Sequence, residues 1–327
     1  MPHPPPIVHG YPTNGSFAEV GSLVVDYGNS SHLICTGTLI SSNVVLTAGH
    51  CSVQIDANLF DSEPVYFIMD EEIDLQNSVD TSQIQILSTI IHPEFDNYLN
   101  NDISLVFLQG NSPISPAKMD IGIPDLNWQN IPFSFVGFGN TDEQANDEGS
   151  KLQAKIPYYD NDDMFHYAID LSGTTTTNLC YGDSGGPMFR TMENGSLTLV
   201  GVNSFVFSIT DEELPCSQGG TGSIRIDMYA QWIADEMGLS VDELFLRDGS
   251  EIQTANDVEI DPDDNVCINE ESCENDKDCS SISDTGETSV PKFGCHIQKE
   301  NFVITGIHSL MLFFVVYGTC FRQRNIL

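Results

Sequence analysis

The sequence predicts an all-β domain that ends in a helix and is followed by a region of a different kind. Up to about residue 226, short apolar runs rich in Val, Ile, Thr and Phe lie between turn signals, a pattern typical of strands. Apolar residues at helical spacing follow in 228–237. Beyond Met237 the composition changes, and Asp and Glu dominate as far as Glu287.

Nine apolar runs carry the strand prediction. They lie at 33–40, 43–47, 64–69, 84–91, 103–108, 133–137, 151–157, 197–207 and 222–226. Residues 111–128 contain Pro and Gly and are predicted to connect two halves of the domain. Residues 141–149 are acidic and polar, as expected of a surface loop.

Two helix starts are predicted near the end of the domain. Asp227 is expected to cap a helix over 228–237, because its carboxylate can accept a hydrogen bond from the first turn. Ser240 and Glu243 have the spacing of a capping box, which predicts a short helix at that point.

Length and charge restrict the class of protein. The chain has 327 residues, enough for a domain of about 230 residues and an extension. It carries 48 Asp and Glu against 11 Lys and Arg, a formal net charge of −37. This charge argues against binding to nucleic acid or to an anionic membrane surface. It would attract cationic substrates within a Debye length of about 10 Å.

Cysteines and glycosylation motifs indicate the compartment. The chain has nine cysteines and three Asn-X-Ser motifs, at Asn14, Asn29 and Asn194. Both features are typical of an oxidising, extracytoplasmic environment, although such motifs also arise by chance.

Residues 180–187, Cys-Tyr-Gly-Asp-Ser-Gly-Gly-Pro, carry the clearest chemical signal. A serine hydroxyl is a weak nucleophile, so Ser184 requires a base and a site for the negative charge that its attack creates. The flanking glycines allow a tight turn that exposes the serine oxygen. They also leave the N–H groups of Gly182 and Ser184 free to hold an oxyanion. Asp183 is suited to pair with a buried cation and so hold the loop open.

The base and its carboxylate partner are predicted from two further motifs. His50 ends the segment Leu-Thr-Ala-Gly-His, and Asp102 lies directly before the apolar run at 103–108. Along the chain the three residues come in the order His50, Asp102, Ser184, which is one of the chain orders known for the Ser-His-Asp catalytic triad. The alternative is a chance Gly/Ser turn beside an ordinary buried histidine and a solvated aspartate. No spacing indicates a zinc or calcium site, so we expect no metal and no cofactor.

From about residue 7 to 237 the chain resembles the chymotrypsin/trypsin family of serine endopeptidases. The three motifs match in order, and residues 7–10, Ile-Val-His-Gly, resemble the mature N-terminus of that family. The resemblance implies two six-stranded antiparallel β-barrels with a C-terminal helix. It also implies hydrolysis of peptide bonds in protein or peptide substrates through an acyl-enzyme. The rival hypothesis is a catalytically silent homologue that acts as a binding or adhesion protein.

The same resemblance assigns an activation pair. Cleavage before Ile7 would free an amine that pairs with Asp183, which makes residues 1–6 the remnant of a pro-segment and the chain a zymogen. Pro6 stands where the family usually has Arg or Lys, so the way in which Ile7 is exposed stays open.

Two features of the predicted substrate pocket depart from the trypsin pattern. Asn178 stands six residues before Ser184, where trypsin-like members have Asp, so a cationic side chain would lack its counter-charge. Ser204, Phe205 and Val206 form the predicted wall, and Val206 replaces a glycine and should narrow the mouth. We expect cleavage after small or medium uncharged residues. The alternative is that these residues only pack and that loops set the specificity.

The resemblance also implies supporting contacts around the site. It pairs Cys35 with Cys51 and Cys180 with Cys216, and it gives Ser204 the role of positioning Asp102. We expect the protease domain to be a monomer.

The extension is divided into three parts. Residues 238–266 are an acidic linker, and residues 267–295 are a small module with Cys267, Cys273, Cys279 and Cys295. Four cysteines in an oxidising compartment predict two disulfides, with a metal knuckle as the alternative.

Residues 302–321 are apolar and long enough to cross a bilayer of about 30 Å. Arg322 and Arg324 follow, which predicts a type I membrane anchor and an extracellular or cell-surface protease. The alternatives are a lipid-anchor signal, a tail anchor or a packed terminal helix.

Overall fold

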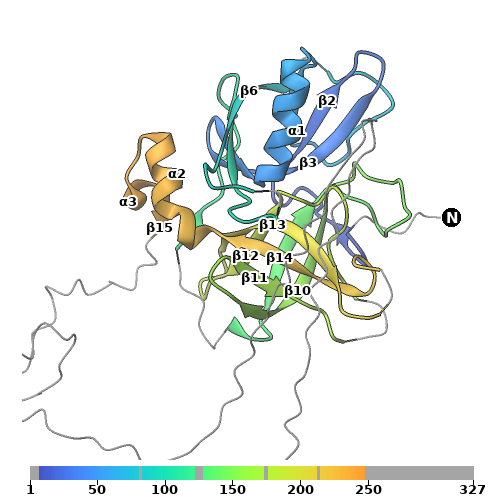
Figure 1. The fold of residues 1–327 in the computed structure, drawn as a ribbon, viewed down its shortest axis with the longest axis vertical. Coiled ribbons are helices and arrows are strands. Elements are labelled where there is room, and N and C mark those ends of the chain that lie inside the picture. Colours follow the sequence, from blue (N-terminus) through green and yellow to red (C-terminus); the bar gives the residue numbers. More distant parts are fainter. Residues whose placement is uncertain are drawn as a thin grey trace, which may run out of the picture. The chain divides into compact units, whose positions relative to one another are not determined.

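Two barrels of antiparallel strands make up most of the described chain (Figure 1). The computed structural model describes residues 7–80, 83–96, 98–121, 128–172, 176–211 and 214–246. The pro-segment remnant 1–6, the cysteine module 267–295, the apolar segment 302–321 and most of the linker lie outside these residues. Within the described ranges, no helix is long and apolar enough to cross a bilayer.

The first barrel is closed by six strands in the order β2-β3-β4-β7-β6-β5. Its strands carry β-branched and aliphatic residues whose side chains fill the barrel, including Val25, Val45 and Leu105. The bounds are β2 (Val20–Asp26), β3 (Ser31–Ser41), β4 (Val44–Thr47), β5 (Val65–Ile68), β6 (Ile84–Ile91) and β7 (Ser104–Leu108).

The second barrel has the strand order β12-β9-β10-β11-β14-β13, and pairing of β12 with β13 closes it. Its core contains a group of aromatic side chains, in which Phe133 and Tyr158 pack around Trp128. The bounds are β9 (Pro132–Gly137), β10 (Leu152–Asn161), β11 (Phe165–Ala168), β12 (Pro187–Thr191), β13 (Leu197–Ser208) and β14 (Gly219–Arg225).

Short strands attach the ends of the domain to the second barrel. β1 (Tyr11–Pro12) pairs with β10, and β8 (Met119–Asp120) pairs in parallel with both β13 and β15 (Phe245–Leu246). The predicted fold of two six-stranded antiparallel barrels with a short C-terminal helix is therefore confirmed.

Four helical segments complete the described chain. They are α1 (Gly49–Phe60), the 3₁₀ segment η2 (Ile226–Tyr229), α2 (Ala230–Met237) and α3 (Val241–Leu244). In Figure 1, α1 lies beside β2, β3 and β6 of the first barrel, while α2 and α3 stand together at one side. Ser240 and Glu243 form the predicted capping box of α3.

The predicted N-cap at Asp227 is wrong. The chain enters a 3₁₀ turn at Ile226, and α2 begins only at Ala230. The Asp227 carboxylate instead accepts hydrogen bonds from the guanidinium of Arg225, with Nη2 at 2.7 Å. Arg225 is buried, and a buried charge without a partner is costly, so the Asp227 carboxylate pairs with Arg225 and does not cap the helix.

Candidate active site

His50 and Asp102 lie in direct contact at the first barrel. His50 is the second residue of α1, and Asp102 lies two residues before β7. The Asp102 carboxylate is fully buried and lies 2.8 Å from His50 Nδ1 through Oδ2, while Oδ1 accepts the backbone N–H of His50 at 2.8 Å. A carboxylate can only accept, so the proton of the neutral ring lies on Nδ1 and Nε2 is free to act as a base.

A third hydrogen bond completes the partners of Asp102. Ser204 Oγ, from β13 of the second barrel, donates to Asp102 Oδ2 at 2.6 Å. A side chain at Gly49 would place its Cβ 3.2 Å from Asp102 Oδ1, so glycine allows this close approach. Asp102 is thus held by both barrels.

The pKa of His50 reflects two opposed effects. Burial lowers the pKa of His50. The charge of Asp102 and the hydrogen bond to Asp102 together raise this pKa by more than burial lowers it, so the pKa of His50 is raised. The imidazole side chain remains 26% exposed, so its outer edge is accessible. An imidazole in this setting is suited to hold a proton temporarily during a reaction.

Asn101, which the sequence marks as a turn residue, and Tyr229 hold the Asp102 turn. Asn101 has a left-handed backbone with φ of 54°, and its carbonyl accepts the N–H of Ile103 at 2.8 Å, so the chain turns tightly at Asp102. The Asn101 side chain accepts from Tyr229 Oη at 3.0 Å and donates to the carbonyl of Glu94 at 3.0 Å. Nothing local in the sequence marks Tyr229, because it lies 128 residues away.

Ser184 lies on a loop that packs against the segment leading into His50. Gly182 and Gly185 have φ of 98° and 78°, conformations that favour glycine. The carbonyl of Ser184 accepts the N–H of Thr36 at 2.9 Å. A side chain at Gly185 would collide with Thr47 and with the backbone of Thr36. The loop therefore lies against residues just ahead of α1.

Thr36 and Asn203 are further supports that the sequence did not reveal. Thr36 Oγ1 donates to the carbonyl of Gly182 at 2.9 Å. The Asn203 carbonyl accepts the N–H of Gly185 at 2.7 Å, and its Nδ2 donates to the carbonyl of Asp183 at 3.4 Å. Both residues join the loop to a neighbouring strand, and neither stands in a recognisable motif.

The predicted triad is only partly assembled by hydrogen bonds. Among the described residues, Ser184 Oγ makes no hydrogen bond to His50, and the N–H groups of Gly182 and Ser184 have no acceptor. His50 Nε2 lies 3.6 Å from Cys51 Sγ. The unbonded N–H groups are the two that the sequence assigns to an oxyanion hole.

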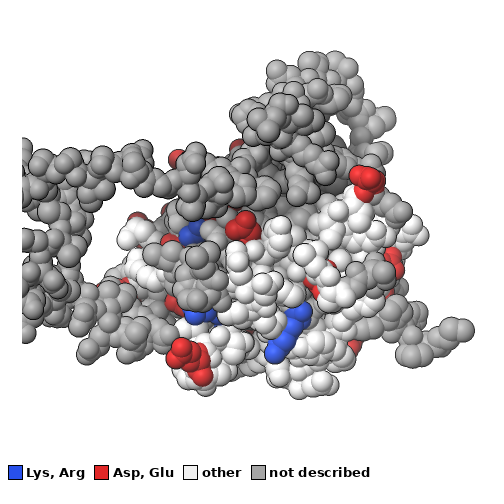
Figure 2. Space-filling view, turned by 90° about the horizontal axis from the view of Figure 1, so that it is seen from below, with Lys and Arg blue, Asp and Glu red and all other residues white. Residues whose placement is uncertain are grey.

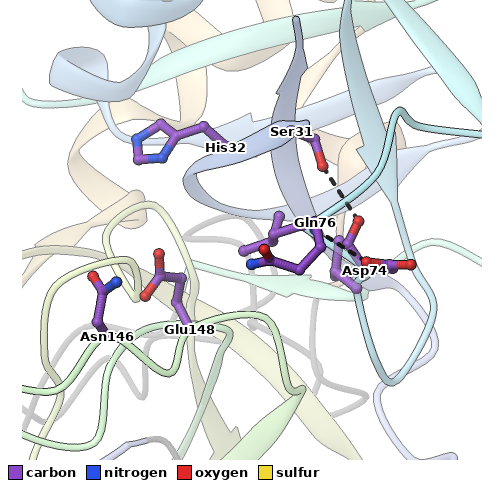
Figure 3. Close-up of a pocket in the computed structure, with 8 residues that line it drawn as sticks. Ser31, His32, Asp74, Gln76, Asn146 and Glu148 are labelled. Atoms are coloured by element: carbon purple, nitrogen blue, oxygen red, sulfur yellow. Dashed lines mark hydrogen bonds between the residues drawn. The ribbon is translucent and has the colours of Figure 1, made fainter. Parts of the chain in front are cut away.

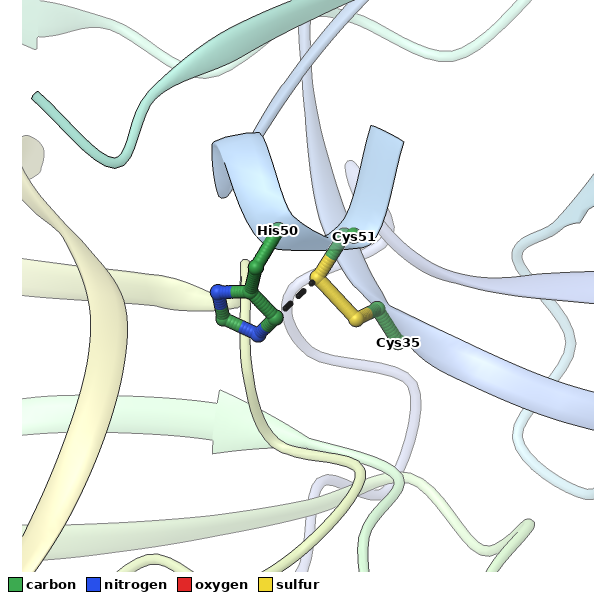
Figure 4. Close-up of side chains that lie close together, drawn as sticks. All are labelled: Cys35, His50 and Cys51. Carbon is green, nitrogen blue, oxygen red and sulfur yellow. Dashed lines mark hydrogen bonds between the residues drawn. A yellow bond between two sulfur atoms is a disulfide. The ribbon is translucent and has the colours of Figure 1, made fainter. Parts of the chain in front are cut away.

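Both predicted disulfides of the protease domain are present. Cys35 bonds to Cys51 and Cys180 bonds to Cys216. Figure 4 shows His50 beside the first of them. Cys35, His50 and Cys51 are close enough together to suggest a metal site, but sulfurs in a disulfide are not thiolates and do not serve as its ligands.

Asp183 is a fully buried carboxylate with two backbone donors. Gly139 N–H donates to Oδ1 at 2.8 Å and Cys180 N–H donates to Oδ2 at 2.9 Å. Burial raises the pKa of Asp183 to about 7, and the two hydrogen bonds only partly oppose this. No described residue forms an ion pair with it.

Ile7 is buried in the core of the second barrel. It packs with the Leu179 cluster, and Val8 pairs with Asn178 through N–H···O bonds of 2.9 and 3.3 Å. Cys180, which donates to Asp183, is only two residues beyond Asn178. Ile7 has φ of 50°, which is strained for a β-branched residue.

The residues of the predicted substrate pocket lie together on the second barrel. Asn178 is buried, and its Nδ2 donates to the carbonyl of Pro215 at 2.9 Å. Val206 packs against the Cys180–Cys216 disulfide. The Phe205 ring lies edge-on to Phe165, with centroids 5.1 Å apart, and covers Gly222.

A polar cavity of about 280 Å³ is lined by none of these residues. Figure 3 shows Asn146 and Glu148 on one side of it, with Ser31, Asp74 and Gln76 on the other. The Asp74 carboxylate is already used within its own turn, because it accepts from Gln76 N–H and Asn77 Nδ2. None of the predicted catalytic residues lines this cavity.

Comparisons with known proteins agree with this geometry. The profile of the family described as Trypsin matches residues 8–233. Over 234 residues the chain is 27% identical to chymotrypsin-like elastase family member 1 of Bos taurus, which covers 65% of this chain and 82% of the relative. It is 27% identical to the Homo sapiens protein of that name over 236 residues, 65% of this chain and 84% of the relative. 

A third relative is a clotting factor subunit. The chain is 25% identical over 244 residues to the clotting factor G beta subunit of Tachypleus tridentatus, covering 66% of this chain and 75% of the relative. The family match covers well over half of the chain, on a fold and a His50–Asp102 pair that fit it. The chain therefore belongs to the trypsin family of serine endopeptidases.

Proposed function

We propose that the chain is an active serine endopeptidase with Ser184 as nucleophile, His50 as base and Asp102 as the residue that orients the base. The observation that carries this proposal is the buried Asp102 carboxylate with three donors, two of them from His50. This arrangement fixes the proton on Nδ1 and leaves Nε2 to accept one from a serine hydroxyl.

The reaction is acyl transfer to and from Ser184. His50 takes the proton of Ser184 Oγ while that oxygen bonds to the peptide carbonyl carbon, and the carbonyl oxygen becomes an oxyanion. The free N–H groups of Gly182 and Ser184 are suited to hold this charge. His50 then gives the proton to the amine as the C–N bond breaks, and water releases the acyl group by the same steps.

We propose that a cut between Pro6 and Ile7 completes the site. Cleavage removes the preceding carbonyl, and with it the backbone clash that strains Ile7 at φ of 50°. It also creates an ammonium group on Ile7, whose side chain packs in one cluster with Leu179, the neighbour of the Cys180 that donates to Asp183. A buried carboxylate with a raised pKa is the expected partner of such a cation.

We propose a preference for small or medium uncharged residues before the scissile bond. Asn178 is a buried neutral amide, so it cannot neutralise a cationic side chain, and Val206 stands against the disulfide wall. A library of peptides that differ only at this residue tests the preference. Asn178→Asp should gain cleavage after Arg or Lys, and an unchanged profile would assign specificity to the loops instead.

A catalytically silent homologue is the second candidate function. It is favoured by the absence, among the described residues, of a hydrogen bond between Ser184 and His50 and of an ion pair for Asp183. In that case the domain would bind proteins without cleaving them.

Labelling with a fluorophosphonate separates the two candidates. The probe is applied to protein that starts at Ile7, to the form that retains Pro6, and to Ser184→Ala. Labelling of the Ile7 form alone supports both the triad and the activation step. No labelling of any folded form would remove the hydrolase proposal and leave the binding protein.

We propose an extracellular or cell-surface location and glycosylation. Two disulfides support an oxidising compartment, and Asn14, Asn29 and Asn194 are all exposed and open to modification. A type I anchor at 302–321 remains part of this proposal. Release of protein from intact cells by an external protease, and a mass shift after glycosidase treatment, test the two statements separately.

Protein or peptide substrates and a monomeric state complete the proposal. The net charge of −37 disfavours nucleic acid as a partner. Figure 2 shows that, on one face, the acidic side chains of the described residues are scattered among uncharged ones rather than gathered. Among the described residues that this view shows, the acidic side chains therefore form no docking patch.

A further inference from the structure

The loop of residues 139–149, which connects β9 to β10, begins in contact with the loop that carries Ser184. Gly139 N–H donates to Asp183 Oδ1 at 2.8 Å. Asn140 N–H donates to the carbonyl of Tyr181 at 2.8 Å. The start of the 139–149 loop is therefore hydrogen-bonded to Tyr181 and Asp183, the two neighbours of Gly182.

Glu143, from the same loop, reaches the turn of residues 214–218. Its Oε1 accepts the N–H groups of Cys216 and Ser217, both at 2.8 Å. Ser217 Oγ lies 3.1 and 3.0 Å from the two carboxylate oxygens. A carboxylate that accepts several donors holds them more firmly than a neutral acceptor would.

We assign the turn of residues 214–218 as a second wall of the proposed substrate pocket, because it contacts the residues that the sequence places in that pocket. The carbonyl of Pro215 accepts Nδ2 of Asn178 at 2.9 Å. Cys216 is bonded to Cys180, and Val206 packs against that disulfide. A displacement of Cys216 would therefore move the residues that define the pocket.

The 139–149 loop fixes Glu143 by its own hydrogen bonds. The Asp142 carboxylate accepts the N–H groups of Gln144 and Ala145 at 2.7 and 2.8 Å. Asp147 accepts the backbone N–H and Oγ1 of Thr141 at 3.0 and 2.7 Å. Glu143 is thus held in place before any substrate arrives, which lowers the cost of ordering the wall on binding.

We propose that Glu143 is a specificity-determining positioning residue for the peptidase. It links the loop that carries Ser184 to the Cys216–Ser217 wall, and so sets the width of the pocket beside Val206. Glu143 acts on the substrate through this wall and contacts no reacting atom. The inference rests on the proposed function and names the element that sets its substrate choice.

The test compares Glu143→Ala and Glu143→Gln with the wild type, all starting at Ile7. The exposed Gln144→Ala, one residue further along the loop, is the matched control. Two peptide substrates are used that differ only in Ala or Phe before the scissile bond. For Glu143→Ala we expect KM for the Ala substrate to rise about tenfold, with kcat changed by less than about threefold.

The ratio of kcat/KM for the Ala substrate to that for the Phe substrate should fall at least about tenfold, because the Ala substrate loses its close fit and a loosened wall rejects the larger side chain less. Glu143→Gln keeps one oxygen that can accept from Cys216 and Ser217, so it should recover part of the ratio. The pH dependence of kcat/KM should stay that of the wild type, because His50 is not disturbed.

An unchanged ratio in Glu143→Ala, or a fall in kcat without a change in KM, would overturn the inference. Fluorophosphonate labelling of this variant at the wild-type rate shows that it is folded. If it does not fold, Glu143→Gln decides: an intermediate ratio supports the role of Glu143, and a wild-type ratio contradicts it. Failure of the wild type itself to label would instead sink the proposed function.

Discussion

The two halves of the proposed active site differ in how completely their polar groups are paired. On the His50 side, Asp102 accepts three hydrogen bonds, from the His50 backbone, the His50 ring and Ser204. On the Ser184 side, Asp183 is just as buried but accepts only two backbone N–H groups, with no ion pair to a described residue.

The difference shows which half folding alone completes. Asp102 and His50 satisfy each other, and the pKa of His50 is raised as a result. Asp183 has no such partner, so burial raises its pKa to about 7. The His50 half is therefore complete in the folded chain, whereas the buried Asp183 carboxylate of the Ser184 half still lacks the cation that the proposed activation would supply through the Ile7 amine.

The largest expected effect, on kcat, comes from a substitution in the His50 half of the site. Asp102→Asn should lower kcat about 10⁴-fold, the loss known for this change in the Ser-His-Asp template, whose type enzymes belong to this family. The asparagine amide would favour the wrong tautomer of His50. Steady-state kinetics of the Ile7 form check this, with Asp74→Asn as a control in a turn away from the catalytic residues. A loss of less than tenfold would argue against the triad.

The second prediction concerns the incomplete half. In the form that retains Pro6, the Asp183 pKa of about 7 lies above its unfolded value near 3.8. Its stabilising contribution is therefore full below pH 4 and is lost as the pH rises through 7. As the pH rises from 4 to 8, the free energy of unfolding of Asp183→Asn should increase by up to about 4 kcal/mol relative to that of the wild type. Urea unfolding at the two pH values measures this difference.

The same comparison in protein that starts at Ile7 provides the control for Asp183. There the ammonium group should lower the pKa of Asp183, so the gain of the variant should disappear or reverse. An equal gain in both forms would mean that Ile7 and Asp183 do not pair.

The sequence marks the residues of the proposed site more clearly than the contacts that hold them. His50, Asp102 and Ser184 each stand in a local motif, and nine strands were marked by apolar runs. Three strands of the barrels were missed: Val20–Asp26 is buried along its whole length and lacks alternation, and Phe165–Ala168 and Pro187–Thr191 are short.

Long-range contacts explain most of what the sequence could not show. Thr36 bonds to Gly182 across 146 residues, and Glu143 bonds to Ser217 across 74. Neither pair leaves a local pattern. The helix α1 was also missed, although Cys51, Ile55 and Leu59 recur at a spacing of four on the face that contacts the core.

A buried histidine, His166, should change the pH dependence of stability in the opposite direction to Asp183. His166 packs beside Trp128 and lies 3.3 Å from Tyr158 Oη, and burial lowers its pKa to about 4. The folded pKa is below the unfolded value of 6.5, so its stabilising contribution is present above pH 6.5 and is lost as the pH falls through 4.

Replacement of His166 should remove this loss. Wild-type stability should fall by up to about 3 kcal/mol from this group between pH 7 and pH 4, and His166→Gln should not show that part of the fall. The same substitution at an exposed histidine, His32→Gln, is measured beside it as the matched control. A wild-type pH dependence in His166→Gln would show that the histidine is not held neutral by the fold.

The smallest expected effect tests whether the complete half depends on the second barrel. Ser204→Ala removes one of the three donors to Asp102 and leaves both bonds to His50 in place. A hydrogen bond to a charged group contributes about 1.5–3 kcal/mol, and part of it is recovered by relaxation, so kcat/KM should fall about tenfold. Ser22→Ala, which removes a buried hydroxyl from β2 away from the site, should leave kcat/KM unchanged.

The acid limb of the pH profile of kcat/KM should also shift in Ser204→Ala, because Asp102 without the Ser204 hydrogen bond interacts differently with the His50 imidazolium. A full wild-type profile in Ser204→Ala would mean that the first barrel alone positions Asp102, and that the second barrel contributes only the Ser184 half.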